Sequence, residues 1–221
     1  MQGGRNLKSI LLSKWTKRIL FLACLVPFAI LLWRILHSDL GPNPVQFVEY
    51  TTGRWTLRFL AITLAIAPAR RILRLPELIR FRRMTGLFAF FYVCMHFLSY
   101  LGIDKYFMWD QIWSDIHKRP YIIAGFTGFV LLIPLALTST AWSIRWLGGK
   151  RWRMLHRLIY LTAVAGVIHY YWQVKSDKRA PLFYAAIFGA LLAWRVGEWF
   201  FKRARKSLAA EARAPRTSAT N

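Results

Sequence analysis

Three of the five histidines lie inside strongly apolar stretches of the chain, where ionisable side chains are rare. These are His96, His156 and His169, whereas His37 and His117 lie in or beside more polar segments. A histidine inside a membrane costs free energy and is therefore a candidate functional group. Neutral imidazole is also a good ligand for iron, so two imidazoles that face each other could hold a haem from both sides.

The sequence offers little other catalytic chemistry. It contains no set of paired carboxylates and no Gly-rich phosphate loop. The two cysteines, Cys24 and Cys94, both lie in apolar segments. This placement argues against a disulfide framework and against a thiolate metal site.

The elements that must position the histidines follow from the composition. Of the 221 residues, 56% are hydrophobic and 16% aromatic, yet 19% are charged, and apolar runs alternate with charged clusters. A hydrocarbon core of about 30 Å requires about 20 apolar residues per helix. The pattern predicts an all-α, multi-pass bundle of six transmembrane helices, at residues 18–36, 53–70, 84–102, 120–141, 154–172 and 181–201.

The basic residues predict the topology. The N-terminus, the second-to-third connection, the fourth-to-fifth connection and the tail together hold 22 of the 32 Lys and Arg. By the positive-inside rule, both termini are cytoplasmic. Topology and anionic lipid head groups therefore explain the net charge of +23 without nucleic acid. We divide the chain into a basic N-terminus (1–17), a transmembrane domain (18–201) and a disordered tail (202–221).

Two of the histidines are expected to lie at the same depth in the membrane. With this topology, the third and fifth helices run in the same direction, and both place a histidine in the outer half of the membrane. The sequence therefore predicts one haem between His96 and His169. His156 lies 13 residues before His169, about 20 Å away along a helix, and could serve a second haem near the cytoplasmic face.

The sequence alone leaves open whether a second haem is bound. On an ideal helix, side chains 13 residues apart point about 140° away from each other. Moreover, the residue 13 positions before His96 is Arg83, so the third helix has no matching histidine. A single membrane histidine can also act as an interhelical hydrogen-bond partner rather than as a metal ligand.

A series of short motifs carries a family resemblance. In chain order they are GPNPV (41–45), TGR (52–54), LIRFRRMTGL (78–87), HFLSY (96–100), KRPY (118–121), LTST (137–140) and LHRLIY (155–160), followed by His169, Tyr170 and Trp172. Together they cover nearly the whole chain. In this order they resemble the haem-binding membrane subunits of bacterial periplasmic methionine-sulfoxide reductase systems, within the ferric-reductase-like transmembrane family.

The resemblance implies cofactors, partners and direction of electron flow. Such a subunit lies in the bacterial inner membrane, carries haem b and is linked to FMN. It takes electrons from the quinone pool or a cytoplasmic flavin reductase. It passes them to a periplasmic molybdopterin-containing methionine-sulfoxide reductase, so it is an electron-transfer subunit rather than the catalytic one. The family's haem-associated histidines match His96, His156 and His169, whereas Arg83 departs from the four-histidine, two-haem pattern of the wider superfamily.

A cluster of arginines before the third helix is a second candidate binding region. Arg74, Arg80, Arg82 and Arg83 could contact a flavin phosphate, haem propionates or a quinone head group, because Arg binds such anions through a two-pronged fork. The alternative is that these charges only set the topology against anionic lipid.

Three other functions are compatible with the residues. One is a cytochrome b subunit of another quinone-linked oxidoreductase. The others are a small transporter that uses histidines in a proton relay, and a structural membrane anchor. The absorption spectrum of the reduced protein separates the two haem functions from the two others.

Overall fold

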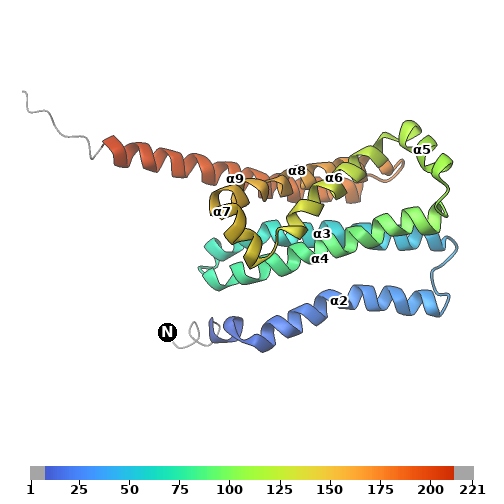
Figure 1. Ribbon diagram of the computed structural model, residues 1–221, viewed down its shortest axis with the longest axis horizontal. Helices are drawn as coiled ribbons and strands as arrows, with labels where there is room; N and C mark the ends of the chain where they lie inside the picture. Colours follow the sequence, from blue (N-terminus) through green and yellow to red (C-terminus); the bar gives the residue numbers. More distant parts are fainter. Residues whose placement is uncertain (1–7, 212–221) are drawn as a thin grey trace, which may run out of the picture.

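The computed structural model describes residues 8–211, and the side chains of residues 8–208 within that range. All regular structure in the described range is helical, which confirms the predicted all-α class (Figure 1). The helices are α2 (Lys14–Leu36), α3 (Pro44–Ile72), α4 (Arg82–Leu98), α5 (Trp109–Lys118), α6 (Pro120–Leu137), α7 (Ala141–Leu155), α8 (Leu158–Gln173) and α9 (Arg179–Glu211), with a 3-10 turn η1 (Pro76–Phe81) and a π-helical turn η2 (Ser99–Asp104).

The longer helices run side by side along the long axis of the molecule, and two short helices mark its ends (Figure 1). We call the end formed by residues 99–119 the α5 end, and the end formed by residues 73–83 and 138–157 the α7 end. Both ends of the described chain point toward the α7 end (Figure 1). Within the bundle, α3 packs along α4, and α6 packs along α8.

Four helical segments are long and apolar enough to cross a membrane. They are Lys14–Leu36, Pro76–Asp104, Pro120–Leu137 and Arg179–Leu208, and they coincide with the first, third, fourth and sixth predicted spans. The second and fifth predicted spans lie on α3 and α8. Helix α8 has only 16 residues, and the apolar run of α3 is interrupted by threonines and by charged residues such as Arg58.

Several predicted boundaries differ from the observed ones. The fourth-to-fifth connection is mostly the helix α7, so the fifth apolar helix begins at Leu158 rather than at residue 154. The tail expected to be disordered from residue 202 is helical up to Glu211, because α9 continues without interruption. Residues 1–7 of the predicted N-terminus and 212–221 of the predicted tail lie outside the described residues.

The starts of α3 and α6 follow from their sequences. Each helix begins with a proline in its first turn, Pro44 and Pro120 respectively. Proline suits this position because its missing N–H would have no helical partner there. In α3, the side chain of Asn43 also accepts a hydrogen bond from the N–H of Gln46 at 3.1 Å, which satisfies one of the free donors at the helix start.

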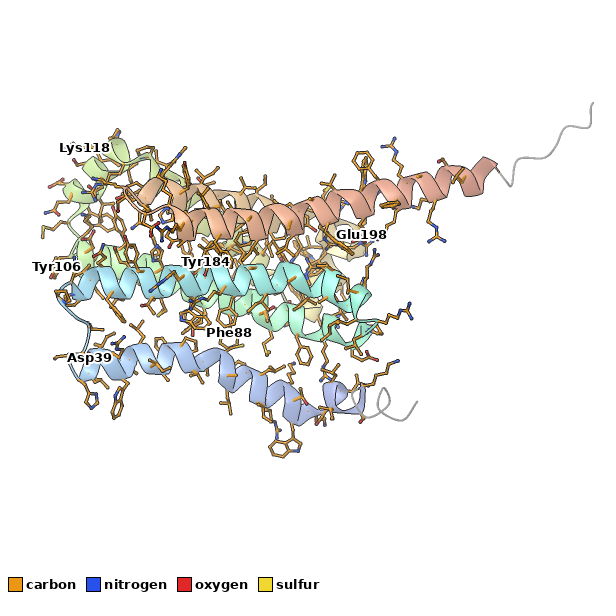
Figure 2. The ribbon with its side chains drawn as sticks, turned by 180° about the vertical axis from the view of Figure 1, so that it is seen from behind. Asp39, Phe88, Tyr106, Lys118, Tyr184 and Glu198 are labelled. Carbon is orange, nitrogen blue, oxygen red and sulfur yellow. The ribbon has the colours of Figure 1, made fainter. Side chains whose placement is uncertain are left out.

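Aromatic side chains fill the core beside α3 and α4. Phe59 stacks on Tyr92 with ring centroids 5.2 Å apart, and on Phe88 at 5.6 Å. Phe88 also contacts Phe21 of α2, with centroids 5.2 Å apart, and Figure 2 places Phe88 between α2 and the α3–α4 pair. This stack therefore joins three helices.

The hydroxyl of Tyr92 is inserted into the backbone of α2. It donates to the carbonyl of Cys24 at 2.9 Å and accepts from the N–H of Phe28 at 3.1 Å. Cys24 and Phe28 are four residues apart, the spacing of a normal helical hydrogen bond. The tyrosine thus replaces one rung of α2 beside Pro27, which itself has no N–H to donate.

The α5 end, where Figure 2 labels Tyr106 and Lys118, carries a small ionic cluster. The ammonium of Lys105 lies 3.1 Å from Asp104 and 2.9 Å from Asp115. Burial lowers the pKa of Lys105, but the hydrogen bonds to the two carboxylates outweigh burial and raise the pKa above its usual value. Lys105 therefore remains charged and ties η2 to α5.

Candidate functional site

His96 on α4 and His169 on α8 face each other near the α5 end of the bundle. Their ring centroids lie 6.0 Å apart, and the ring planes are inclined at 77°. The sequence predicted that these two histidines lie at the same depth in the membrane, and the structure places them together. They come from two different helix pairs, because α4 packs on α3 and α8 packs on α6.

Each of these imidazoles uses the same nitrogen to bind the backbone of a neighbouring helix. Nδ1 of His96 lies 3.0 Å from the carbonyl oxygen of Glu49, and Nδ1 of His169 lies 2.7 Å from that of Tyr121. A carbonyl can only accept, so Nδ1 carries the proton in both rings. In a neutral imidazole this leaves the lone pair of Nε2 available for a metal ion.

The spacing of the two rings fits a single iron between them. An imidazole nitrogen binds a metal ion at about 2 Å, and the ring centre lies roughly 1 Å beyond that nitrogen. Two axial imidazoles on one haem iron therefore have ring centres roughly 6 Å apart, and the observed separation is 6.0 Å. The protonated Nδ1 atoms and this separation together suit bis-histidine ligation.

His156 lies at the α7 end and is bonded differently. It follows the last residue of α7 and precedes α8, so a break in the helix separates it from His169. Its Nε2 lies 3.0 Å from Oγ1 of Thr138. That hydroxyl donates its proton to the carbonyl of Pro134 at 2.6 Å. Nε2 of His156 must therefore donate to the hydroxyl of Thr138. The ring also stacks on Trp152 at 3.9 Å.

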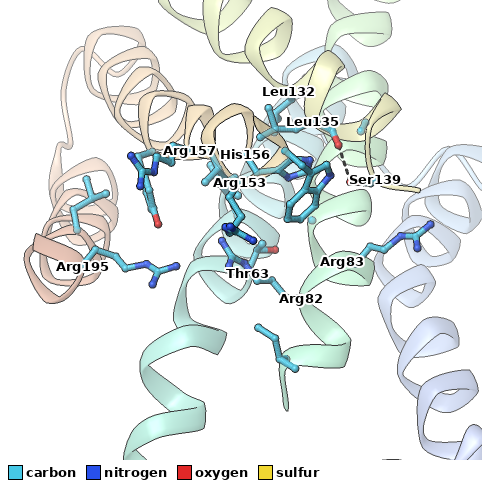
Figure 3. A pocket seen from close by; sticks show the side chains of 18 of the residues that line it. Thr63, Arg82, Arg83, Leu132, Leu135, Ser139, Arg153, His156, Arg157 and Arg195 are labelled. Carbon is cyan, nitrogen blue, oxygen red and sulfur yellow. Dashed lines mark hydrogen bonds between the residues drawn. The ribbon is translucent and has the colours of Figure 1, made fainter. Parts of the chain in front are cut away.

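A large cavity surrounds His156. Its volume is about 1230 Å³, and its walls come from α3, α4, α6, α7, α8 and α9. This volume exceeds that of most pockets for small organic ligands. The walls are mainly apolar, but several arginines contribute, among them Arg82, Arg153 and Arg195 (Figure 3). The cavity therefore suits a large, mostly apolar ligand with negatively charged groups.

The four arginines singled out in the sequence separate in the structure. Arg82 and Arg83 both line the cavity, although the guanidinium group of Arg83 lies apart from the others (Figure 3). Arg80 instead donates to the carbonyl of Leu11 at 2.9 Å. Arg74 ends the α3 region in a left-handed conformation, with φ of 55°, and is not part of the cavity wall among the described residues.

A carboxylate and its cations close one side of the cavity. Glu198 lies 2.7 Å from Arg71, 2.6 Å from Lys202 and 3.4 Å from Arg195. One acid thus serves three cations. Nε of Arg195 is buried and has no hydrogen-bond partner among the described side chains. A buried donor without a partner is costly. The Nε of Arg195 is therefore available to an anionic group in the cavity, while Nη1 of the same side chain contacts Glu198.

Several groups that contact the histidines could not be identified from the sequence. The carbonyls of Glu49 and Tyr121 are backbone atoms, and their side chains say nothing about the hydrogen bonds to histidine. Thr138, Trp152 and Arg153 were missed as neighbours of His156, since the helix α7 was not expected. His37 and His117 bond to carbonyls of their own helix turns and are exposed.

Comparison with known proteins identifies the family. The sequence profile described as ferric reductase like transmembrane component matches residues 52–167. The chain is 53% identical to the protein-methionine-sulfoxide reductase heme-binding subunit MsrQ of Caulobacter vibrioides, over 81% of this chain and 86% of the relative. The proteins of the same name from Rhodospirillum rubrum and Herminiimonas arsenicoxydans are 48% and 47% identical, over 89% and 86% of this chain and 93% and 88% of the relatives.

No solved structure matches the chain. The profile covers more than half of the residues, and it contains His96, His156 and most of the cavity. The curated relatives extend the match over most of the remaining chain. The protein is thus a multi-pass membrane protein that belongs to the ferric-reductase-like transmembrane family and, within it, to the MsrQ heme-binding subunits of protein-methionine-sulfoxide reductase.

Proposed function

We propose that this protein carries electrons across the bacterial inner membrane to a periplasmic molybdopterin-containing methionine-sulfoxide reductase. Its donor is the quinone pool or a cytoplasmic flavin reductase, and its redox group is haem b. The observation that supports this proposal best is the pair of imidazoles at 6.0 Å, each with Nδ1 bonded to a backbone carbonyl. The names of the relatives supply the methionine-sulfoxide reductase system.

His96 and His169 are the proposed axial ligands. Haem, when bound, accepts and releases single electrons. The carbonyls of Glu49 and Tyr121 hold each ring in one tautomer, and such hydrogen bonds increase the basicity of the metal-binding nitrogen. Burial of a haem among apolar side chains is a further influence on its potential.

The cavity at the α7 end is the proposed entry point for electrons. Its arginines and apolar walls suit a second haem with its propionates, the FMN phosphate or a quinone head group. His156 is the candidate ligand for a second haem, together with Arg82 and Arg83 as anion contacts. Ligation through Nε2 would require His156 to leave Thr138, which lies 3.0 Å away.

The proposed topology has six spans with both termini in the cytoplasm. Helices α3 and α8 complete the set, because each packs along a neighbour that is apolar enough to span the membrane alone. In this orientation the histidine pair lies toward the periplasm and the arginine-lined cavity toward the cytoplasm. Electrons would therefore move from the α7 end to the α5 end.

Cofactor stoichiometry in purified protein tests the proposal. Dithionite-reduced protein should show the sharp bands of b-type haem, and haem and FMN are counted per chain. A featureless spectrum would contradict an electron-transfer function and favour a transporter or an anchor. Anaerobic reduction by a quinol, compared with NADH plus a flavin reductase, identifies the donor. Reoxidation by the periplasmic reductase with methionine sulfoxide tests the acceptor.

The same measurement on His156→Ala counts the haems. If two haems are bound, this variant should keep the component that belongs to His96 and His169 and lose the other. An unchanged haem count would leave the cavity to FMN or a quinone. Complete loss of haem would contradict a separate outer site.

A further inference from the structure

A glycine lies directly against each of the two paired histidine rings. A Cβ atom built on Gly125 of α6 would lie 2.5 Å from Nδ1 and 2.8 Å from Cε1 of His169. A Cβ atom built on Gly53 of α3 would lie 3.2 Å from Cε1 and 3.3 Å from Nδ1 of His96. Distances below 3.0 Å do not occur for real Cβ atoms, so no larger residue fits at Gly125 with the ring in place.

Each glycine stands four residues after the carbonyl that its histidine binds. Gly53 follows Glu49 by four positions, and Gly125 follows Tyr121 by four. In an α-helix the carbonyl of residue i is directed at residue i+4, and the Cβ of that residue lies beside the oxygen. A glycine at i+4 therefore opens the side of the helix to an outside donor.

The same arrangement occurs twice, on helices that are unrelated in position. On one side α4 brings His96 against α3, and on the other α8 brings His169 against α6. Both α3 and α6 also start with proline in the first turn, and both present the carbonyl ahead of the glycine. The repetition argues that the arrangement is required by the imidazoles rather than by helix packing in general.

We propose that Gly53 and Gly125 are positioning residues, each forming a seat that holds one imidazole with Nε2 directed at the iron. This inference rests on the proposed function, since it assigns a role toward the haem between His96 and His169. The absence of a side chain lets Nδ1 reach the helix carbonyl, and the carbonyl then fixes the rotation of the ring. The seats thereby set the angle of 77° between the ring planes.

The two seats differ in how closely they fit. The Cβ of an alanine at position 125 would displace the ring of His169, whereas at position 53 a shift of a few tenths of an ångström would suffice. We therefore expect Gly125→Ala to weaken haem retention by about tenfold or more, the usual cost of losing an outer-shell partner of a metal ligand. Gly53→Ala should retain haem but alter its potential and its low-spin EPR spectrum, which depends on the angle between the axial imidazole planes.

The test compares these two variants with two glycine controls in full-length purified protein. Gly128→Ala lies on α6 and makes only ordinary contact, with its nearest atom, Cβ of Ala165, at 3.6 Å. Gly189→Ala lies on α9 and meets nothing within 4 Å. Haem per chain, midpoint potential, EPR spectrum and elution as a single species are measured for all four variants and for the original protein.

The inference stands if Gly125→Ala and Gly53→Ala change haem retention or the EPR spectrum in the expected order while both controls match the original protein. It is overturned if the two seat variants keep the original potential and spectrum. It is also overturned if they fail to assemble while both controls assemble, because the glycines would then serve packing. If the original protein shows no bis-histidine haem at all, the proposed function fails instead.

Discussion

The histidines at the two ends of the bundle use opposite nitrogens. Near the α5 end, His96 and His169 donate through Nδ1 to backbone carbonyls, which leaves both Nε2 atoms available. At the α7 end, His156 engages Nε2 itself with Thr138. In the first arrangement Nε2 can ligate iron without a change of hydrogen bonds. In the second, His156 must release Thr138 before its Nε2 can bind a metal.

The surroundings of the two regions also differ, because the histidine pair is tightly held and His156 borders a wide cavity. The histidine pair is held mainly by carbonyls of α3 and α6, which cannot lose or gain a proton. The hydroxyl of Thr52 adds a longer contact to Nδ1 of His96 at 3.4 Å. The other region is a cavity of about 1230 Å³ with several arginines, which suits ligands of more than one shape. One region thus holds two histidines in a fixed geometry, whereas the other offers a wide cavity lined by several cations.

The largest expected effect is on the histidine pair. His96→Ala or His169→Ala should remove the main haem signal, with at least a tenfold loss of bound haem, because each residue supplies one axial bond. His37→Ala and His117→Ala are matched controls, since both rings are exposed and bond only to their own helix turn. The reduced spectrum per chain measures the effect. Full haem content in either ligand variant would disprove the pairing.

A smaller effect is expected in the cavity. Arg82→Gln removes one cation from the cavity wall and should weaken binding of FMN or haemin there by about tenfold, the usual worth of one hydrogen bond to a charged group. Arg74→Gln is the control, because Arg74 lies outside the cavity wall. Titration of the purified protein with each ligand gives the affinities. Equal weakening by the two substitutions would indicate a general effect of charge rather than a site.

The smallest effect concerns the bond that occupies His156. Thr138→Val removes the hydroxyl at 3.0 Å from Nε2, while the bond from Trp152 to the carbonyl of residue 138 remains possible. If His156 ligates through Nε2, haemin binding in the cavity should tighten by about fivefold, because one competing hydrogen bond of about 1 kcal/mol is gone. Haemin titration measures the change. Weaker binding would show instead that Thr138 orients the ring.

The sequence predicted that His96 and His169 lie together better than it predicted the surroundings of His156, for physical reasons. Apolar length and charge bias locate helices and their direction, and direction alone placed His96 and His169 at one depth. The helix α7 was missed because it is basic, polar in its middle and broken at Gly148, where φ is 72°. Without α7, the contacts of His156 and the wall residues of the cavity could not be predicted.

Backbone partners were beyond sequence reasoning for a different reason. A carbonyl oxygen is present at every position, so nothing marks those of Glu49 and Tyr121 as hydrogen-bond acceptors for imidazoles. Only the relative rotation of neighbouring helices selects them. A glycine four positions later accompanies both carbonyls.

The rung of α2 that Tyr92 occupies has a consequence for how this helix associates with the rest of the bundle. Cys24 and Phe28 can pair with each other or with the tyrosine, but not fully with both. Separation of α2 from α4 would let the N–H of Phe28 and the carbonyl of Cys24 pair with each other, so the helix would itself supply the hydrogen bond that Tyr92 now takes over. The hydrogen bonds of the Tyr92 hydroxyl to Cys24 and Phe28 therefore exist only while α2 is docked on α4.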